Sequence, residues 1–311
     1  MKKNSKRIIL YTTTIIMLTA GATFKINKDK SDELVKEINE YTDNFTNDDF
    51  LIAAHRGFSS LEIENTTDAF SLANSKDYID FIEMDVRLTK DNKLVLSHDD
   101  YLLAEGEYSV DISSSDYDNI MDTSLIYQNS YFFSHKINFA ERSLINSRIN
   151  NLIGKKYKLN NLLEGINSSN NKKIILDLKF QNNEDEFIEE LIKELKGINT
   201  DNIIFQSTDI GGLLELKEKT NFRCQLLVDS KYDLMFLDDF DYYGIKKNLA
   251  TYDLVKNLLD TDNKVAVWTI NNSNDLDNII DELGDSYKDV LYITDYPDLI
   301  ATKLYYKQKE E

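Results

Sequence analysis

Short apolar runs recur along most of the chain, and stretches with helical periodicity separate many of them. From residue 50 onward, each run has the length of a β-strand and is bounded by polar or turn-forming residues. Short apolar strands that alternate with helices predict parallel βαβ units. The runs are FLIAA at 50–54, FIEMDV at 81–86, LVLS at 94–97, KIILDL at 173–178, NIIFQS at 202–207, CQLLVD at 224–229, KVAVWTI at 264–270 and VLYITD at 290–295.

Several amphipathic stretches lie between these runs and predict the crossover helices. Periodicity alone does not separate a closed barrel from an open, doubly wound sheet with as many strands, and we expect the closed barrel. The predicted helices are NTTDAFSLANSK, EDEFIEELIKELK, TYDLVKNLL and SNDLDNIIDELG, the last ending in a glycine at the position of a C-terminal cap.

The length of the chain accommodates one large domain. It has 311 residues, of which 41% are hydrophobic, and an α/β barrel commonly occupies about 250 residues. We expect residues 50–305 to form this domain. Within it, residues 101–157 lack regular alternation and contain several aromatic residues. This region predicts an insertion, after the second strand-loop unit, that caps one end of the barrel.

The N-terminal segment has the pattern of a targeting sequence. MKKNSKR is basic, and an uncharged stretch from Ile8 to Phe24 follows it. Ala20-Gly21-Ala22 resembles a signal-peptidase site, so residues 1–24 act as a cleaved signal peptide or as a membrane anchor. In both cases the rest of the chain lies outside the cell or at its surface.

Residues 25–49 are polar and charged, and they join the targeting segment to the predicted barrel. Leu34, Ile38 and Tyr41 lie at helical spacing within this segment. The pattern predicts a polar tether that contains a short helix.

The formal charge of -19 limits the classes of ligand. It leaves no broad cationic surface for a nucleic-acid backbone, so we expect no nucleic-acid partner. An anionic substrate would need local positive charge from a metal ion or an arginine. The one cysteine, Cys224, cannot form an internal disulfide and lies in the apolar run FRCQLLV, where we expect a structural role.

Two of the three histidines stand at the ends of predicted strands: His55 follows LIAA, and His98 follows LVLS. The active sites of barrel enzymes lie at the C-terminal ends of the strands, so both imidazoles are candidates for catalysis. The third, His135, falls among aromatic residues of the insertion, and there we expect a structural or exposed residue.

Glu83 and Asp85 form the second candidate group. Two residues apart on a strand, their side chains share one face, while Ile82, Met84 and Val86 form the opposite, apolar face. We therefore expect the two acids to point toward the barrel axis. Buried carboxylates need a compensating cation, and Ca²⁺ or Mg²⁺ prefers oxygen ligands.

Three further residues extend this group. Asp177 lies two residues before Lys179 in ILDLK, and it is either a third oxygen ligand beside an ammonium group or half of an ordinary ion pair. Arg56 directly follows His55 and precedes Gly57. Its guanidinium group suits bidentate binding of a phosphate.

These motifs together resemble the glycerophosphodiester phosphodiesterase family. AHRG is followed in order by ENTTDAF, IEMDVRLTKDNKLVLSHD, LDLK, VAVWTIN and YITDYPD, from about Phe50 to Leu299. Any one of these motifs is weak, whereas six in order are specific.

The resemblance implies a (β/α)8 TIM barrel that hydrolyses glycerophosphodiesters to glycerol 3-phosphate and an alcohol. His55 and His98 would be the acid and base, Glu83 and Asp85 would bind the metal, and Arg56 would hold the phosphate. Glu64 and Asn65 resemble the family's ENT element near the metal and substrate, and Lys179 would add positive charge there.

Three departures from the family pattern are visible. Asp177 stands where the family more often has a glutamate, which shortens one ligand arm. Ile63 replaces the proline that usually precedes ENT, and the family's arginine- and threonine-rich stretch after HD is absent. The insertion is therefore expected to recognise a different head group.

The sequence leaves several alternatives open. A phospholipase D-like lyase would form a cyclic phosphate from related residues, and an inert surface protein would keep the barrel as a binding module. The substrate is either a small glycerophosphodiester or a glycerophosphate polymer of the cell envelope. Trp268 either forms the floor of the glycerol pocket or packs in the core. The membrane is a partner only if the N-terminal segment stays uncleaved.

Overall fold

The computed structural model describes residues 25, 27–45, 50–106, 108–128, 137–181 and 183–310. Within these residues, eight parallel strands close into a barrel, because the first strand pairs with both the second and the last. The predicted closed (β/α)8 TIM barrel is thereby confirmed. In order around the barrel, the strands are β1 (Leu51–Ala54), β2 (Phe81–Leu88), β8 (Lys173–Leu178), β9 (Ile203–Ser207), β10 (Arg223–Val228), β11 (Tyr242–Lys246), β12 (Lys264–Trp268) and β13 (Leu291–Thr294).

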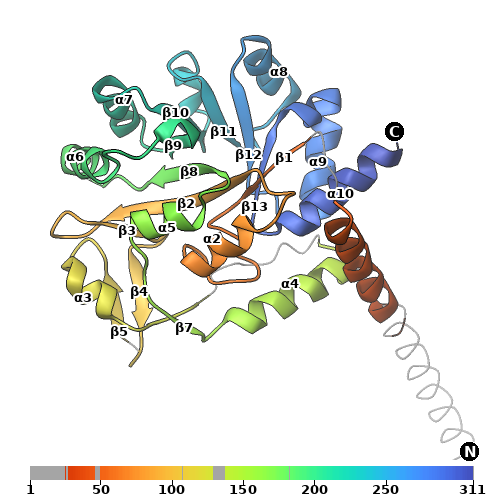
Figure 1. Cartoon of the computed structure of the whole chain (residues 1–311). Coiled ribbons are helices and arrows are strands. Elements are labelled where there is room, and N and C mark those ends of the chain that lie inside the picture. The colour runs from red at the N-terminus through yellow and green to blue at the C-terminus, as the bar shows by residue number, and fades with distance from the viewer. Residues whose placement is uncertain are drawn as a thin grey trace, which may run out of the picture.

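Helices surround the barrel and connect its strands (Figure 1). All four helices predicted from periodicity form, namely α2, α6, α8 and α9. Between β10 and β11 the connection contains the 3₁₀ helix η2 instead of an α-helix. The helices are α2 (Thr67–Asn74), α5 (Leu162–Ser168), α6 (Glu184–Glu194), η1 (Thr200–Asn202), α7 (Ile210–Lys219), η2 (Asp233–Phe236), α8 (Tyr252–Asp260), α9 (Ser273–Leu283), η3 (Gly284–Asp289) and α10 (Pro297–Glu310).

One run predicted as a barrel strand forms a hairpin strand instead, and one strand of the barrel was not predicted from the sequence. The run LVLS forms β3 (Leu94–Leu96), which pairs antiparallel with the end of β2 as a hairpin and does not belong to the closed barrel. The barrel strand missing from the prediction is β11, whose sequence YYGIK contains a glycine and ends in lysine. A hydrophobic run does not show whether a strand pairs parallel or antiparallel with its neighbour. The sequence therefore did not distinguish the hairpin strand β3 from a parallel strand of the barrel.

The two sides of the barrel wall bury different residues. Ile82, Met84 and Val86 belong to the large apolar layer between strands and helices. A smaller apolar cluster, which includes Phe81 and Ile175, fills the interior of the barrel. Glu83 and Asp85 also lie on the interior side and are buried. The apolar plug thus leaves the C-terminal end of the barrel to polar residues.

The insertion contains its own small sheet. In its described part, four short strands pair in the order β5-β4-β6-β7, beside helices α3 and α4. Figure 1 shows this unit beyond β2 and β3, with α4 running from it toward the N-terminal helix. The elements are β4 (Tyr101–Ala104), β5 (Tyr108–Asp111), α3 (Tyr117–Asp122), β6 (Leu125–Ile126), α4 (Phe139–Leu152) and β7 (Lys156–Tyr157).

Residues 27–43 form a helix that packs on the domain. Leu34 and Ile38 are buried against Ile145 of α4 and Leu299 of α10, and Tyr41 contacts the ring of Tyr305. Figure 1 shows this helix beside both α4 and α10. The segment predicted as a tether therefore includes a packed element, because its three apolar side chains share one buried face.

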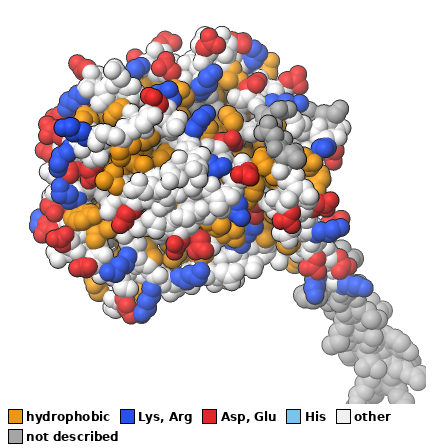
Figure 2. All heavy atoms as spheres, in the orientation of Figure 1, with side chains coloured by type: hydrophobic (Ala, Val, Ile, Leu, Met, Phe, Trp, Pro, Cys, Tyr) orange, Lys and Arg blue, Asp and Glu red, His pale blue; other side chains and the backbone are white. Residues whose placement is uncertain are grey.

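The predicted targeting segment, residues 1–24, lies outside the described residues, as does His135. In the part of the chain that the structure describes, no helix combines the length and apolar character needed to cross a bilayer. Figure 2 shows acidic and basic side chains interspersed over one face of the domain, with apolar patches between them.

Candidate active site

A cluster of three buried carboxylates lies inside the barrel. Glu83 and Asp85 come from β2 and Asp177 from β8, and oxygen atoms from all three lie within 4.8 Å of one another. Strand pairing explains part of this arrangement, because Asp85 is directly opposite Asp177 in the β2–β8 register. The side chains of Glu83 and Asp85 are each only 1% exposed.

The turn after β1 brings backbone and side chains to this cluster. Arg56 has a φ of 58° and Gly57 a φ of 79°, and the backbone N–H of Arg56 donates to Oε2 of Glu83 at 2.7 Å. A Cβ at Gly57 would lie 2.8 Å from the backbone of Ala69. Glycine is therefore required for the turn that aims this amide at Glu83.

Asn65 and Glu64 hold the other side of the cluster. The amide of Asn65 donates to Oδ2 of Asp85 at 2.8 Å, and its oxygen accepts from the backbone N–H of Asp85 at 2.9 Å. Asn65 also has a positive φ of 57°. Glu64 accepts from Nη1 of Arg56 at 3.0 Å. The HRG and ENT motifs thus meet around β2.

Two cations accompany the three acids. Nζ of Lys179 lies 2.9 Å from Asp85 and 2.6 Å from Asp177, and Nε of Arg56 lies 3.3 Å from Asp85. Burial would raise the pKa of Asp85, but these two cations outweigh it and hold the pKa well below its usual range. Asp85 is therefore ionised.

Glu83 is in the opposite situation. Burial, together with the neighbouring charges of Asp85 and Asp177, raises its pKa well above the usual range. Burial also raises the pKa of Asp177, against the effect of Lys179. Two of the three carboxylates thus lack sufficient compensating charge, and an additional cation would favour their ionised forms.

The donor set fits a hard divalent cation. All three side chains offer oxygen atoms, which Ca²⁺ and Mg²⁺ prefer. Oε1 of Glu83 is buried and has no hydrogen-bond partner, although buried carboxylate oxygens are normally satisfied. Glu83, Asp85 and Asp177 are therefore the residues that would hold the ion.

His55 lies between this cluster and the last strand of the barrel. Its Nε2 is 3.9 Å from Oε2 of Glu83, and its Nδ1 is 2.7 Å from Oδ1 of Asp295. Asp295 also accepts from Ser59 at 3.1 Å and from Asn271 at 2.5 Å. Burial would raise the pKa of Asp295, but the charges of His55 and Arg56 and the hydrogen bonds from His55 and Asn271 hold it below the usual range.

His98 approaches from the loop after β3. Its side chain is 38% exposed, and Nδ1 lies 2.8 Å from Oδ1 of Asp99. Its carbonyl oxygen accepts from Nε and Nη2 of Arg87 at 2.9 and 2.5 Å, so Arg87 fastens the loop to β2. Positive charge on either His55 or His98 lowers the pKa of Asp85. Both imidazoles therefore lie close enough to the cluster to act electrostatically on Asp85.

Trp268 lines a groove beside the His55 side of the mouth. The groove has a volume of about 550 Å³ and also contacts Lys246, Lys247 and Asp295. The indole N–H donates to the carbonyl oxygen of Gly244 at 2.8 Å. The side chain packs on the interior cluster and also borders the groove. A role of Trp268 in a glycerol pocket stays a prediction.

Sequence reasoning missed two groups of site residues. Asp295 and Asn271 lie in the motifs YITDYPD and VWTIN, which gave the family resemblance without assigning these side chains. Their position directly after β13 and β12 was the available signal, because barrel sites collect there. Tyr127 and Tyr157 lie in the insertion, where no periodic pattern marked them.

The fold and the site together define a class of protein. It is a (β/α)8 barrel that gathers a buried acidic cluster and two imidazoles at the C-terminal mouth. A model of the Glycerophosphoryl diester phosphodiesterase family matches residues 55–299. The chain therefore belongs to this family.

Two curated relatives match short stretches of the chain. The putative glycerophosphodiester phosphodiesterase YhdW of Bacillus subtilis is 55% identical over 49 residues, 16% of this chain and 20% of that protein. The uncharacterized protein MG293 of Mycoplasma genitalium is 51% identical over 53 residues, 17% of this chain and 21% of that protein. Both alignments thus cover about a fifth of the curated relatives.

Solved structures show the same fold at low identity. An Oleispira antarctica phosphodiesterase, solved in complex with the product sn-glycerol-3-phosphate, has a TM-score of 0.62 and 20% identity, with 82% of this chain and 96% of that chain covered. A putative glycerophosphoryl diester phosphodiesterase from Silicibacter pomeroyi has a TM-score of 0.66 and 16% identity, with 82% and 94% covered.

Proposed function

We propose that this protein hydrolyses glycerophosphodiesters to glycerol 3-phosphate and an alcohol in a reaction that depends on a divalent metal ion, Ca²⁺ or Mg²⁺. The observation that carries the proposal is the buried cluster of Glu83, Asp85 and Asp177. Nε2 of His55 lies 3.9 Å from Glu83, and His98 lies near enough for its charge to act on Asp85. The family match and the neighbour solved with sn-glycerol-3-phosphate support the same reaction.

The metal ion, when bound, would stabilise the negative charge that develops on the phosphate oxygens. Arg56 and Lys179 lie beside the acids and add fixed positive charge for the same purpose. Glu64 and Asn65 hold Arg56 and Asp85 in place.

Each of the two imidazoles carries out one proton transfer of the proposed reaction. Asp295 is buried and ionised, and its hydrogen bond to Nδ1 of His55 directs Nε2 toward the acidic cluster. We assign His55 to remove the proton from the nucleophile, which is water or an adjacent substrate hydroxyl. His98 then protonates the departing alcohol oxygen. Imidazole is the side chain most often used for proton transfer near neutral pH, and it can act as an acid or as a base.

The test is release of glycerol 3-phosphate from glycerophosphocholine and from glycerophosphoglycerol by the purified domain. We expect turnover that stops with a chelator and returns with Ca²⁺ or Mg²⁺, and that falls about 10²- to 10⁴-fold in His98→Ala. No release from either substrate, or full activity of His98→Ala, would contradict the proposal. Formation of a cyclic phosphate product would identify the protein as the lyase. Turnover of a glycerophosphate polymer, measured as a third substrate, would distinguish an enzyme that acts on the cell envelope from one that acts on small diesters.

We also propose that the domain works outside the cell or at its surface. The basic start and the uncharged stretch from Ile8 to Phe24 support this placement. Fractionation of cells that express the full chain tests it. Recovery of the protein in the cytoplasmic fraction alone would refute it.

A further inference from the structure

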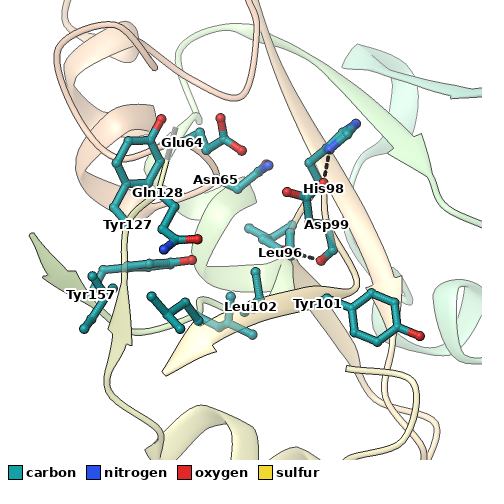
Figure 3. A pocket seen from close by; sticks show the side chains of 14 residues that line it. Glu64, Asn65, Leu96, His98, Asp99, Tyr101, Leu102, Tyr127, Gln128 and Tyr157 are labelled. Carbon is teal, nitrogen blue, oxygen red and sulfur yellow. Dashed lines mark hydrogen bonds and ion pairs between the residues drawn. The ribbon is translucent and has the colours of Figure 1, made fainter. Parts of the chain in front are cut away.

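A second cavity lies between the barrel mouth and the inserted sheet. It has a volume of about 180 Å³. Glu64, His98 and Asp99 line it from the barrel side, and Tyr127 and Tyr157 from the insertion (Figure 3). We call this cavity the tyrosine pocket. Because His98 lines it, the pocket begins where one arm of a bound phosphodiester would leave the catalytic centre.

Aromatic and aliphatic side chains form its inner wall. Tyr127 is 6% exposed and Leu102 is 9% exposed, and Figure 3 shows the Tyr157 ring between them. Tyr101 also borders the pocket, but Figure 3 shows its ring pointing away from the others. Two tyrosine rings and a leucine thus offer apolar surface and electron-rich faces to a ligand.

The pocket has a negative electrostatic character. Burial raises the pKa of the Tyr157 hydroxyl, and the charges of Glu64 and Asp99 raise it further. Burial likewise raises the pKa of Tyr127, with Glu64 adding to the effect. Both phenols therefore stay neutral and lie close to carboxylates.

Part of this negative charge is already paired. Oε1 of Glu64 accepts from Arg56, and Oδ1 of Asp99 is hydrogen-bonded to His98. Among the described residues that line the pocket, however, none is a lysine or an arginine. The groove on the opposite side of the mouth differs, because Lys246 and Lys247 line it together with Asp275 and Asp295, and Lys247 pairs with Asp275. The two exits from the catalytic centre thus differ in charge.

We propose that the tyrosine pocket binds the alcohol arm of the substrate when that arm carries an alkylammonium group, as choline does. The inference rests on the proposed function and narrows its substrate class. A quaternary ammonium ion is attracted to aromatic faces and to nearby carboxylates, and its methyl groups pack on apolar walls. Anionic arms, including those of a glycerophosphate polymer, are disfavoured beside Glu64 and Asp99.

This placement agrees with the assigned proton transfer. The alcohol arm in the tyrosine pocket brings the departing oxygen to His98, which lines the same pocket. The nucleophile that His55 deprotonates forms a new bond to phosphorus, and the phosphorus–oxygen bond to the alcohol arm breaks. The protonated His98 gives its proton to the departing alcohol oxygen, and the glycerol arm keeps the phosphate. The glycerol arm lies on the opposite side, toward the groove at Trp268.

The first experiment compares substrates that differ in the charge of one arm. The 3,3-dimethylbutyl ester of glycerol 3-phosphate has the shape of glycerophosphocholine, with carbon in place of the charged nitrogen. We expect kcat/KM for glycerophosphocholine to be about 5- to 30-fold higher, the range for a cation-π interaction in a partly desolvated site. Equal rates for these two diesters would overturn the inference while leaving the hydrolase intact.

Variants of Tyr157 then test whether the preference for the charged arm arises in the tyrosine pocket. Tyr157→Leu removes the aromatic face and should reduce the preference to about twofold or less, whereas Tyr157→Phe keeps the ring and should retain it. Tyr108→Leu is the matched control, because Tyr108 lies on β5 of the same inserted sheet and is 56% exposed. An unchanged preference in Tyr157→Leu would place the ammonium group elsewhere and refute the inference.

A binding measurement tests the tyrosine pocket even if the protein hydrolyses none of the diesters. Choline chloride and 3,3-dimethylbutanol are titrated separately into the full domain and followed by calorimetry. The inference predicts that choline binds more tightly and that Tyr157→Leu loses this difference. No binding of choline, or equal binding of both compounds, would refute the pocket independently of the enzyme activity.

Discussion

Nδ1 of His55 lies 2.7 Å from Oδ1 of Asp295, although 240 positions of the chain separate the two residues. The contact exists because β1 pairs with β13 when the barrel closes. Asp295 is buried, its pKa is held below the usual range, and Ser59 and Asn271 fix its orientation. The carboxylate therefore positions the imidazole.

The variant Asp295→Asn tests this positioning role. We expect kcat to fall about 10²-fold or more, because the amide no longer fixes the tautomer and orientation of His55. Asp295 is ionised well below neutral pH, so its own titration does not contribute to the pH profile of kcat between pH 5.5 and pH 8. A pH profile of kcat measures the loss, and unchanged metal affinity is the control because Asp295 lies outside the acidic cluster.

The variant Asp177→Asn tests the metal site. It keeps one oxygen atom but removes a negative charge from the cluster of Glu83, Asp85 and Asp177. Affinity for Ca²⁺ or Mg²⁺ should fall at least about tenfold, since loss of even an outer partner of a metal site typically costs that much. Calorimetric titration measures the change, and Asp238→Asn, at an exposed acid near η2, is the control. Equal affinities of the two variants would argue against Asp177 as a ligand.

The variant Arg148→Ala tests how α4 is attached to the barrel. Arg148 pairs with Asp298 at 2.5 Å and donates to Ser60 at 3.2 Å, and the side chains of the pair are only 11% and 6% exposed. Removal of the guanidinium leaves Asp298 buried without its partner and should lower the free energy of unfolding by about 3–5 kcal/mol. Urea unfolding measures it. Asn146→Ala, on the exposed side of α4, should change stability by less than about 0.5 kcal/mol.

Much of the local arrangement follows from the sequence. The alternation IEMDV predicts that Glu83 and Asp85 share the interior face of β2, and both are buried there. Four helices follow from their apolar periodicity and end signals, among them α9 with its C-terminal cap at Gly284. The family motifs indicated the barrel, and they identified His55, His98 and the acids as candidate residues of a single active site.

Other features depended on distant parts of the chain. β11 was missed because YYGIK is short and interrupted by glycine, and LVLS was assigned to the barrel because apolar character does not encode strand direction. Tyr127 and Tyr157 line one pocket only because the inserted sheet folds over the loop that carries His98.

The sequence by itself determined which side chains share a face, since that depends only on backbone geometry over a few neighbouring residues. It also indicated most of the alternation of strands and helices along the chain, except that β11 was missed and β3 lies outside the barrel. Only the tertiary structure decided that Asp295 supports His55 and that tyrosines of the insertion face His98. Such neighbours depend on which strands pair when the barrel closes, and burial of the whole core selects that pairing.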